Sequence, residues 1–409
     1  MVATAGMPQA STPPAAGVEG GSRSRLLIAG MTIGHLGNDS YANFVPYLMP
    51  LLAKELGFSL TSAGFATTVY MLTSSLLQPY FGHFADRRDA PWIAVLGVCT
   101  SALGASFLGL APDYAFVLLF AALCGLGTAA YHPQAASSVY NSSGANKGSS
   151  MSIYMFGGNI GLALSPLIVS LAVDQFGLRS TPVLLLTGGV AALLVYWTSM
   201  AAQSGRGVRP AQQRSFLGEA RHKWHVLWPI LMVVSLRAIT VSVMTALLPF
   251  YLRDKHMSDV AVGGIISVMF LAGALTGISL GFLADRTRSP NRFLVFTLIG
   301  ATPMLLGLLP ATGLWLWVFA VASGALLNGS FPLLTTTSQR LMPGNVGMVS
   351  GLVLGFSQGL GGVVVTPLSA IADATNPGIV LAGCSMLPVL AGLFVFRLRA
   401  DSQQRPGAQ

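Results

Sequence analysis

Four ionisable side chains lie well inside long apolar stretches of the sequence: His35, Asp39, His132 and Arg237. A charged side chain at the centre of an isolated membrane helix costs about 2.5–3.5 kcal/mol on insertion scales, so such residues are usually paired and functional. His35 and Asp39 are four residues apart and therefore share one face of a helix. We predict that Asp39 is a proton-binding carboxylate and that His35 assists it.

Arg237 is the expected basic counterpart of Asp39. Counted along their helices, Asp39 lies roughly 20 Å and Arg237 roughly 18 Å from the same side of the membrane. An ion pair at ~4 Å would gain about 4 kcal/mol at an effective dielectric constant of 20. The planar guanidinium can also offer two parallel hydrogen bonds to an oxyanion. We expect Arg237 to bind an anionic substrate in competition with Asp39; a permanent structural ion pair is the alternative.

His132 lies at a depth similar to that of His35, roughly 12 Å into its own span. Gln134 projects about 200° away from His132 around the helix. We therefore predict that His132 faces a central cavity together with His35 and that both help to recognise the anion, while Gln134 packs against a neighbouring helix. A histidine that only packs between helices is the alternative. Asn38 and Asn159 are further candidates for substrate contacts.

The composition indicates which elements position these residues. Of 409 residues, 53% are hydrophobic and only 9% are charged, against roughly 25% charged in soluble domains. This excludes a soluble globular protein. Apolar windows of about 20 residues, the length that crosses a bilayer, predict an all-α integral membrane protein with twelve transmembrane helices. They are expected near residues 26–51, 61–84, 92–111, 114–140, 149–173, 180–200, 225–252, 260–283, 291–309, 314–339, 347–371 and 377–396.

Basic residues are concentrated in one set of connections. Outside the spans, seventeen Lys and Arg residues fall on the side of both termini and four on the opposite side. By the positive-inside rule, both termini and the 201–224 loop are expected in the cytoplasm. The net charge of +9 is then a topology signal, and no nucleic-acid partner is expected. The expected partners of a monomeric chain are lipid, protons and a small anion.

The two halves of the sequence align when one is shifted by 199 residues. Gly82-His83-Phe84-Ala85-Asp86-Arg87 then falls on Gly281-Phe282-Leu283-Ala284-Asp285-Arg286, and His132-Pro133 falls on Phe331-Pro332. A parallel repeat of six spans predicts two pseudo-equivalent six-helix bundles with a substrate site near the midplane between them. The expected units are a disordered tail (1–22), a first bundle (23–200), a cytoplasmic linker (201–224), a second bundle (225–397) and a C-terminal tail (398–409).

The repeated loop motif is a candidate gate. Its glycine allows a neighbouring helix to approach, and its aspartate can accept hydrogen bonds from a helix N-terminus or an arginine across the interface. Both copies, with gating residues Gly82, Asp86, Arg87, Gly281, Asp285 and Arg286, resemble the loop signature of the major facilitator superfamily. That resemblance implies a cytoplasmic latch for the outward-open state; a capped turn with solvated basic residues is the alternative. Glycines spaced by four in three spans are expected at the interface between the halves.

Chemistry that requires a bound nucleotide, cofactor or metal has no support in the sequence. Residues 144–149 lack the phosphate-binding spacing of a Walker motif. We therefore expect a transporter driven by an ion gradient, with no cofactor, no metal and no enzymatic activity.

Several stretches resemble the fosmidomycin-resistance branch of the major facilitators: His35-Leu36-Gly37-Asn38-Asp39, Leu76-Leu77-Gln78-Pro79, Tyr131-His132-Pro133-Gln134, Gly157-Gly158-Asn159-Ile160-Gly161 and 343–351. The resemblance implies a proton-coupled antiporter that expels fosmidomycin, a small phosphonate, from the bacterial cytoplasm. Gln134 stands where the branch is expected to carry glutamate. The alternatives are a proton-coupled symporter that imports a small anionic metabolite, a lipid flippase and a membrane sensor.

Overall fold

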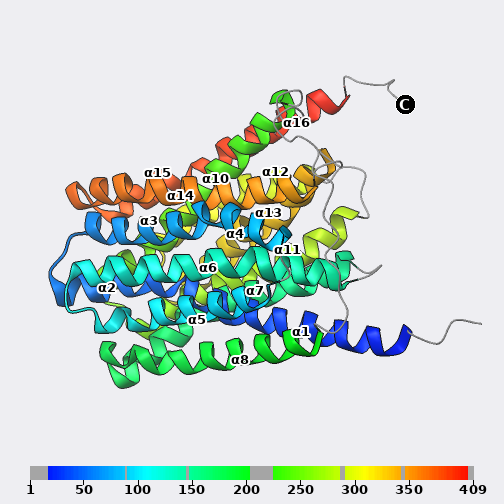
Figure 1. The fold of residues 1–409 in the computed structure, drawn as a ribbon. Coiled ribbons are helices and arrows are strands. Elements are labelled where there is room, and N and C mark those ends of the chain that lie inside the picture. The colour runs from blue at the N-terminus through cyan, green and yellow to red at the C-terminus, as the bar shows by residue number, and fades with distance from the viewer. Residues whose placement is uncertain are drawn as a thin grey trace, which may run out of the picture.

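The computed structural model describes residues 17–87, 90–143, 147–202, 224–285, 291–341 and 346–403. Over these residues every regular element is a helix, and the long helices run side by side in one bundle (Figure 1). The described helices begin at Gly17 and end at Gln403 on the same side, which we call the terminal end. The opposite side, where the α2–α3 and α14–α15 connections lie, is the distal end.

The first half of the chain comprises α1 (Gly17–Ala42), α2 (Phe44–Leu56), α3 (Leu60–Leu76), α4 (Gln78–Arg87), α5 (Trp92–Phe107), α6 (Tyr114–Ser142), α7 (Lys147–Phe176) and α8 (Leu185–Ala202), with 3-10 helices η1 (Leu108–Leu110) and η2 (Leu178–Leu184). The second half comprises α10 (Trp224–Asp254), α11 (Asp259–Asp285), α12 (Asn291–Leu308), α13 (Gly313–Leu341), α14 (Val346–Ala374), α15 (Pro377–Ser385) and α16 (Leu387–Gln403).

Three expected spans are interrupted by a single residue, between α1 and α2, α3 and α4, and α15 and α16. The interruptions fall at Asn43, Leu77 and Met386, two or three residues before a proline. Proline offers no N–H to the carbonyl four residues before it and disfavours helical geometry at the preceding residue. Ten helices or joined helix pairs of the described chain are long and apolar enough to cross a membrane. The other two expected spans correspond to α1–α2 and α3–α4.

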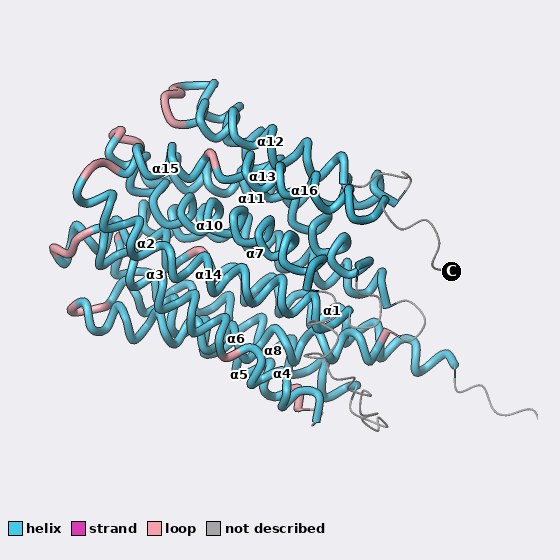
Figure 2. Tube along the Cα trace, turned by 90° about the horizontal axis from the view of Figure 1, so that it is seen from above, coloured by secondary structure: helices cyan, strands magenta, loops and turns pink. Residues whose placement is uncertain are grey.

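The packing of the helices repeats between the halves. Within the first half α1 packs on α7 and α8, and α6 packs on α3 and α5. Within the second half α10 packs on α14 and α16, and α13 packs on α11 and α12, which are the equivalent pairs under the 199-residue shift. Figure 2 shows these helices from above. The predicted all-α fold of two pseudo-equivalent bundles is therefore confirmed.

Two symmetry-related helix pairs join the halves, α3 with α14 and α7 with α11. Gly64 on α3 lies against Ser369 on α14, and the equivalent Gly263 on α11 lies against Ser170 on α7. At the distal end, the Asp373 carboxylate of α14 accepts hydrogen bonds from the backbone N–H groups of Leu60 at 2.9 Å and Thr61 at 2.7 Å. These N–H groups belong to the first turn of α3, which has no partners of its own for them. The halves are thus fastened together at the distal end.

Among the described residues, a side chain added at Gly82 would meet only Pro133 of the same half, at 3.7 Å, and one added at Gly281 would meet none within 4 Å. Asp86 and Arg87 end α4 and Asp285 ends α11, but their side chains lie outside the described part of the structure, as does Arg286. The role of this motif as a latch stays a prediction.

Two expectations from the sequence need correction. Residues 17–22 and 398–403, expected in the tails, continue α1 and α16, because no proline lies between 15 and 45 or between 389 and 405 to interrupt them. Residues 1–16, 404–409 and most of the expected linker, 203–223, lie outside the described residues.

Two of the three glycine repeats behave differently from the expectation. Gly157 and Gly161 pack α7 against α1 of the same half, and Gly273 packs α11 against α13 of the same half. The third repeat, on α14, does lie at the interface between the halves, where Ser75 of α3 meets Gly359 and donates to the Gly355 carbonyl at 2.7 Å. Spacing marks the close-packed face of a helix but not which helix approaches it.

Candidate functional site

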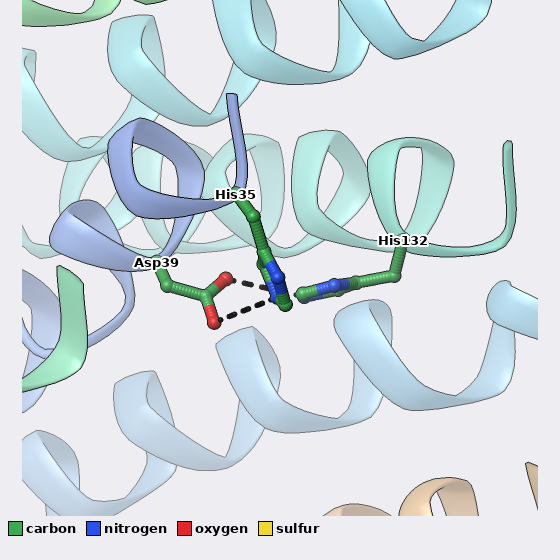
Figure 3. Close-up of side chains that lie close together, drawn as sticks. All are labelled: His35, Asp39 and His132. Carbon is green, nitrogen blue, oxygen red and sulfur yellow. Dashed lines mark ion pairs between the residues drawn. The ribbon is translucent and has the colours of Figure 1, made fainter. Parts of the chain in front are cut away.

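Asp39, His35 and His132 lie close together, and each histidine is paired with the Asp39 carboxylate (Figure 3). His35 Nε2 is 3.2 Å from Asp39 Oδ2, and His132 Nε2 is 3.3 Å from Asp39 Oδ1. His35 and Asp39 belong to α1, and His132 belongs to α6. The exposed fraction of the side chain is 3% for His35, 10% for Asp39 and 24% for His132. Burial therefore decreases along the cluster from His35 to His132.

Tyr154 on α7 holds the ring of His35 in place. His35 Nδ1 is 2.7 Å from the Tyr154 backbone carbonyl, and the two rings stack with their centroids 4.1 Å apart. This close approach requires a glycine on the next turn of α7. A Cβ at Gly158 would collide with His35 Nε2 and would lie 2.7 Å from Asp39 Oδ2. Gly158 belongs to a stretch that carries the family resemblance, but the sequence did not predict that it positions the cluster.

The remaining contact of Asp39 runs back to α5. Asn38 Nδ2 donates to Asp39 Oδ1 at 3.1 Å, and Ser101 Oγ donates to Asn38 Oδ1 at 2.8 Å. Because Asn38 is fully buried and its amide is engaged on both sides, it orients Asp39 in this conformation and is not free for a substrate. No pattern in the sequence pointed to Ser101, since a serine in an apolar helix carries no distinctive spacing.

The contacts of His35 fix the proton content of its pair with Asp39. A carbonyl oxygen only accepts hydrogen bonds, so Nδ1 of His35 donates to Tyr154. If His35 were neutral and Asp39 ionised, the lone pair of Nε2 would face the carboxylate at 3.2 Å. If the ring proton were on Nε2 instead, the lone pair of Nδ1 would face the Tyr154 carbonyl oxygen. Both contacts are satisfied only when the pair holds one further proton, as imidazolium with carboxylate or as imidazole with carboxylic acid.

Arg237 occupies the second half, on α10, and is only 7% exposed. Its Nε donates to the Leu327 carbonyl at 3.1 Å and to Ser330 Oγ at 3.0 Å, and its Cζ lies 4.7 Å from the centre of the Phe331 ring. The predicted ion pair with Asp39 is wrong for this conformation. Each of the two side chains turns instead to partners in its own half.

The two charged sites occupy related positions in the repeat. Under the 199-residue shift Arg237 corresponds to Asn38, and Phe331 corresponds to His132. The first half therefore presents a carboxylate with two imidazoles where the second half presents a guanidinium over a benzyl ring. Within the described part of the chain, Arg237 donates hydrogen bonds only from Nε, and its two Nη groups could donate to a ligand.

An apolar pocket adjoins the arginine. Its walls include Val241 and Met244, which continue the Arg237 face of α10, Met269 and Phe270 from α11, and Leu327, whose carbonyl accepts from Arg237. A ligand bound at the guanidinium would thus have apolar surface beside it.

The other candidate residues are placed as follows. His132 stands beside His35, with ring centroids 5.0 Å apart, as the depth argument predicted. Gln134 is buried and its Nε2 lies 3.4 Å from Ser138 Oγ of its own helix, while its Oε1 has no partner among the described residues. Asn159 is half-buried and directly follows Gly158.

The histidine cluster also satisfies a simple spacing criterion for a metal ion. His35, Asp39 and His132 each offer one ligand atom, and these atoms lie within 4.8 Å of one another. Each is, however, already in direct carboxylate–imidazole contact, and we interpret the group as a proton-binding cluster.

Comparison with known proteins agrees with this architecture. The model of the Major Facilitator Superfamily matches residues 31–366, so the chain belongs to that superfamily. It is a multi-pass membrane transporter and not an enzyme.

Individual relatives cover nearly the whole chain. The fosmidomycin resistance protein of Escherichia coli (strain K12) is 28% identical over 375 residues, covering 90% of this chain and 92% of its own. An uncharacterised transporter of Bacillus subtilis (strain 168), YfnC, is 29% identical over 412 residues, covering 93% and 94%. A bacterial homologue of the human lysosomal transporter Spinster has the same fold, with a TM-score of 0.76 at 16% identity, covering 95% of this chain and 99% of its own.

Proposed function

We propose that this transporter is a proton-coupled antiporter that exports a small anionic drug, such as fosmidomycin, from the bacterial cytoplasm. It would act as a monomer in the inner membrane with both termini in the cytoplasm, the orientation favoured by its basic connections. The similarity to the fosmidomycin resistance protein of Escherichia coli supports the choice of fosmidomycin as the first substrate to test.

One observation carries the proposal: the two halves hold buried groups of opposite chemistry at related positions. The first half has the His35–Asp39–His132 cluster, and the second has Arg237. Exchange of a proton for an anion by alternating access needs one binding group for each. In a repeat of six helices, groups at the middle of each half border the region between them, where transporters of this architecture bind substrate.

Arg237 is suited to the anionic end of the substrate. Its side chain is fixed by the Leu327 carbonyl, Ser330 and the ring of Phe331, so little conformational entropy is lost when a ligand binds. A phosphonate would accept two parallel hydrogen bonds from the Nη groups. Asn159 is a further polar contact for the substrate.

The opposite direction of coupling has one observation in its favour. A protonated His132 would attract an anion, and this attraction favours simultaneous binding of proton and substrate, as in a symporter that imports a small anionic metabolite. Antiport requires that the two ligands bind alternately. The direction of transport under a known pH gradient distinguishes the two functions.

The test uses the full chain in liposomes with an imposed pH gradient and radiolabelled fosmidomycin. Antiport predicts that substrate accumulates on the acidic side, against its own gradient. Asp39→Asn should abolish this accumulation while leaving exchange of substrate across the membrane, because the amide retains the shape of the carboxylate but cannot ionise. Accumulation on the alkaline side would establish symport, and accumulation by Asp39→Asn equal to that of the wild type would refute the role of Asp39.

A further inference from the structure

The two histidines of the cluster differ in how their ring nitrogens are engaged. Both nitrogens of His35 face acceptors, Nδ1 the Tyr154 carbonyl at 2.7 Å and Nε2 the Asp39 carboxylate at 3.2 Å. With 3% of its side chain exposed, His35 is shielded from water. Loss of the proton shared with Asp39 would therefore leave two acceptors in contact at a buried site, which is unfavourable because neither is hydrogen-bonded there.

His132 has one nitrogen in the cluster and one outside it. Its Nε2 faces Asp39 Oδ1 at 3.3 Å, and Nδ1 makes no hydrogen bond with any of the described residues. Its side chain is 24% exposed. Neutral His132 can donate from Nε2 to the carboxylate while the lone pair of Nδ1 faces outward. Protonated His132 makes the same contact and carries its second proton on Nδ1. Either state satisfies the surroundings.

The other groups that face the cluster do not titrate in the same range. The described titratable side chains around it are phenols: Tyr131 of α6, Tyr154 of α7 and Tyr70 of α3. Phenols ionise near pH 10 in water. The neighbouring α5 contributes Ser101, which does not titrate. Asp39, His35 and His132 are therefore the groups whose protonation matters between about pH 5 and 8.

We infer that the exchangeable proton of this transporter binds at Nδ1 of His132, whereas the His35–Asp39 pair keeps its own proton throughout the exchange in this conformation. In the imidazolium–carboxylate form of that pair, the Asp39 carboxylate accepts the Nε2–H of His132 and so holds the protonated ring in place. A proton from water forms the bond to Nδ1 and returns to water from the same atom. This inference rests on the proposed proton coupling and specifies the atom that carries it.

The direct test is nuclear magnetic resonance of the full chain labelled with 15N-histidine, in detergent with a chelator present. Signals are assigned by His35→Gln and His132→Gln. We expect the Nδ1 signal of His132 to change from unprotonated to protonated as pH falls through about 8 to 5, and His35 to keep a protonated Nδ1 over that range. If His35 titrates in this range while His132 does not, the inference is wrong.

A second measurement keeps the test independent of the signal assignment. Potentiometric titration should show that His132→Gln takes up one proton fewer per chain than the wild type over the same range. The control is His256→Gln, on an exposed connection at the distal end. It also removes one solvent-accessible imidazole, but it should not change the proton release that accompanies substrate binding. Equal substrate-linked proton release in wild type and His132→Gln would overturn the inference. Failure of the proposed function is a separate result, in which wild-type liposomes show no transport driven by the pH gradient even though His132 titrates.

Discussion

Replacing Gly158 by alanine would insert one methyl group into the contact between α7 and the proton-binding cluster. The new Cβ would lie 2.7 Å from Asp39 Oδ2, whereas ordinary contact begins at 3.4 Å. The carboxylate must therefore withdraw by about 0.7 Å, and a shift along the His35–Asp39 contact would lengthen it from 3.2 Å to about 3.9 Å, beyond hydrogen-bond range. A charge-assisted hydrogen bond contributes about 1.5–3 kcal/mol, and overpacking costs a further 1–3 kcal/mol or so.

The assay is transport of fosmidomycin in liposomes driven by a pH gradient, measured beside thermal unfolding in detergent. Since about 1.4 kcal/mol corresponds to a factor of ten, uphill transport by Gly158→Ala should fall at least tenfold. The matched control is Gly189→Ala on α8, where an added Cβ meets nothing within 4 Å. If the two variants unfold at the same temperature and Gly158→Ala keeps the wild-type pH profile, Gly158 does not position the cluster.

Three further variants test the other contacts. Arg237→Ala should lose binding of a phosphonate measured by calorimetry, and Arg237→Lys should not restore it, because lysine lacks the planar fork; wild-type affinity in either variant would contradict the assignment. Ser101→Ala should release the Asn38 amide and reduce the rate of proton-driven transport severalfold, for a lost hydrogen bond of about 1 kcal/mol, with substrate binding unchanged at a pH where His132 is neutral. Asp373→Asn should weaken the contact between the two halves at the distal end by up to about 1 kcal/mol. This corresponds to roughly a fivefold shift from the conformation in which that end is closed to one in which it is open. Spin-label distances between exposed residues of α2 and of the α10–α11 connection should then lengthen, and an unchanged distance distribution would show that this carboxylate does not hold the halves together.

The sequence was sufficient to predict the helices and their repeat, because apolar length and a 199-residue self-similarity are properties of the chain itself. It also predicted that His35 and Asp39 meet, since their spacing of four residues sets them on one face. The proximity of His132 followed from depth alone, and the structure bears it out. Depth does not fix the direction of a side chain around its helix axis, which is why the same reasoning failed for Asp39 with Arg237.

Other parts of the site had no sequence signal that could have revealed them. The acceptor that fixes the His35 ring is a backbone carbonyl, which every residue possesses. Gly158 and Ser101 are of common types in membrane helices, and their roles depend on which helix faces them. Two of the three glycine repeats were assigned to the wrong interface for the same reason.

The paired contacts of Gly64 with Ser369 and of Gly263 with Ser170 have a mechanical consequence. Each joins a helix of one half to a helix of the other, and the repeat relates one contact to the other. Two points of close contact define a line. Rotation of one half about that line leaves both contacts in place, whereas sliding along the membrane normal or twisting within the membrane plane would break at least one of them. The line through these two contacts can therefore serve as a rotation axis, and the motion that the fold resists least is a rocking of one six-helix unit against the other.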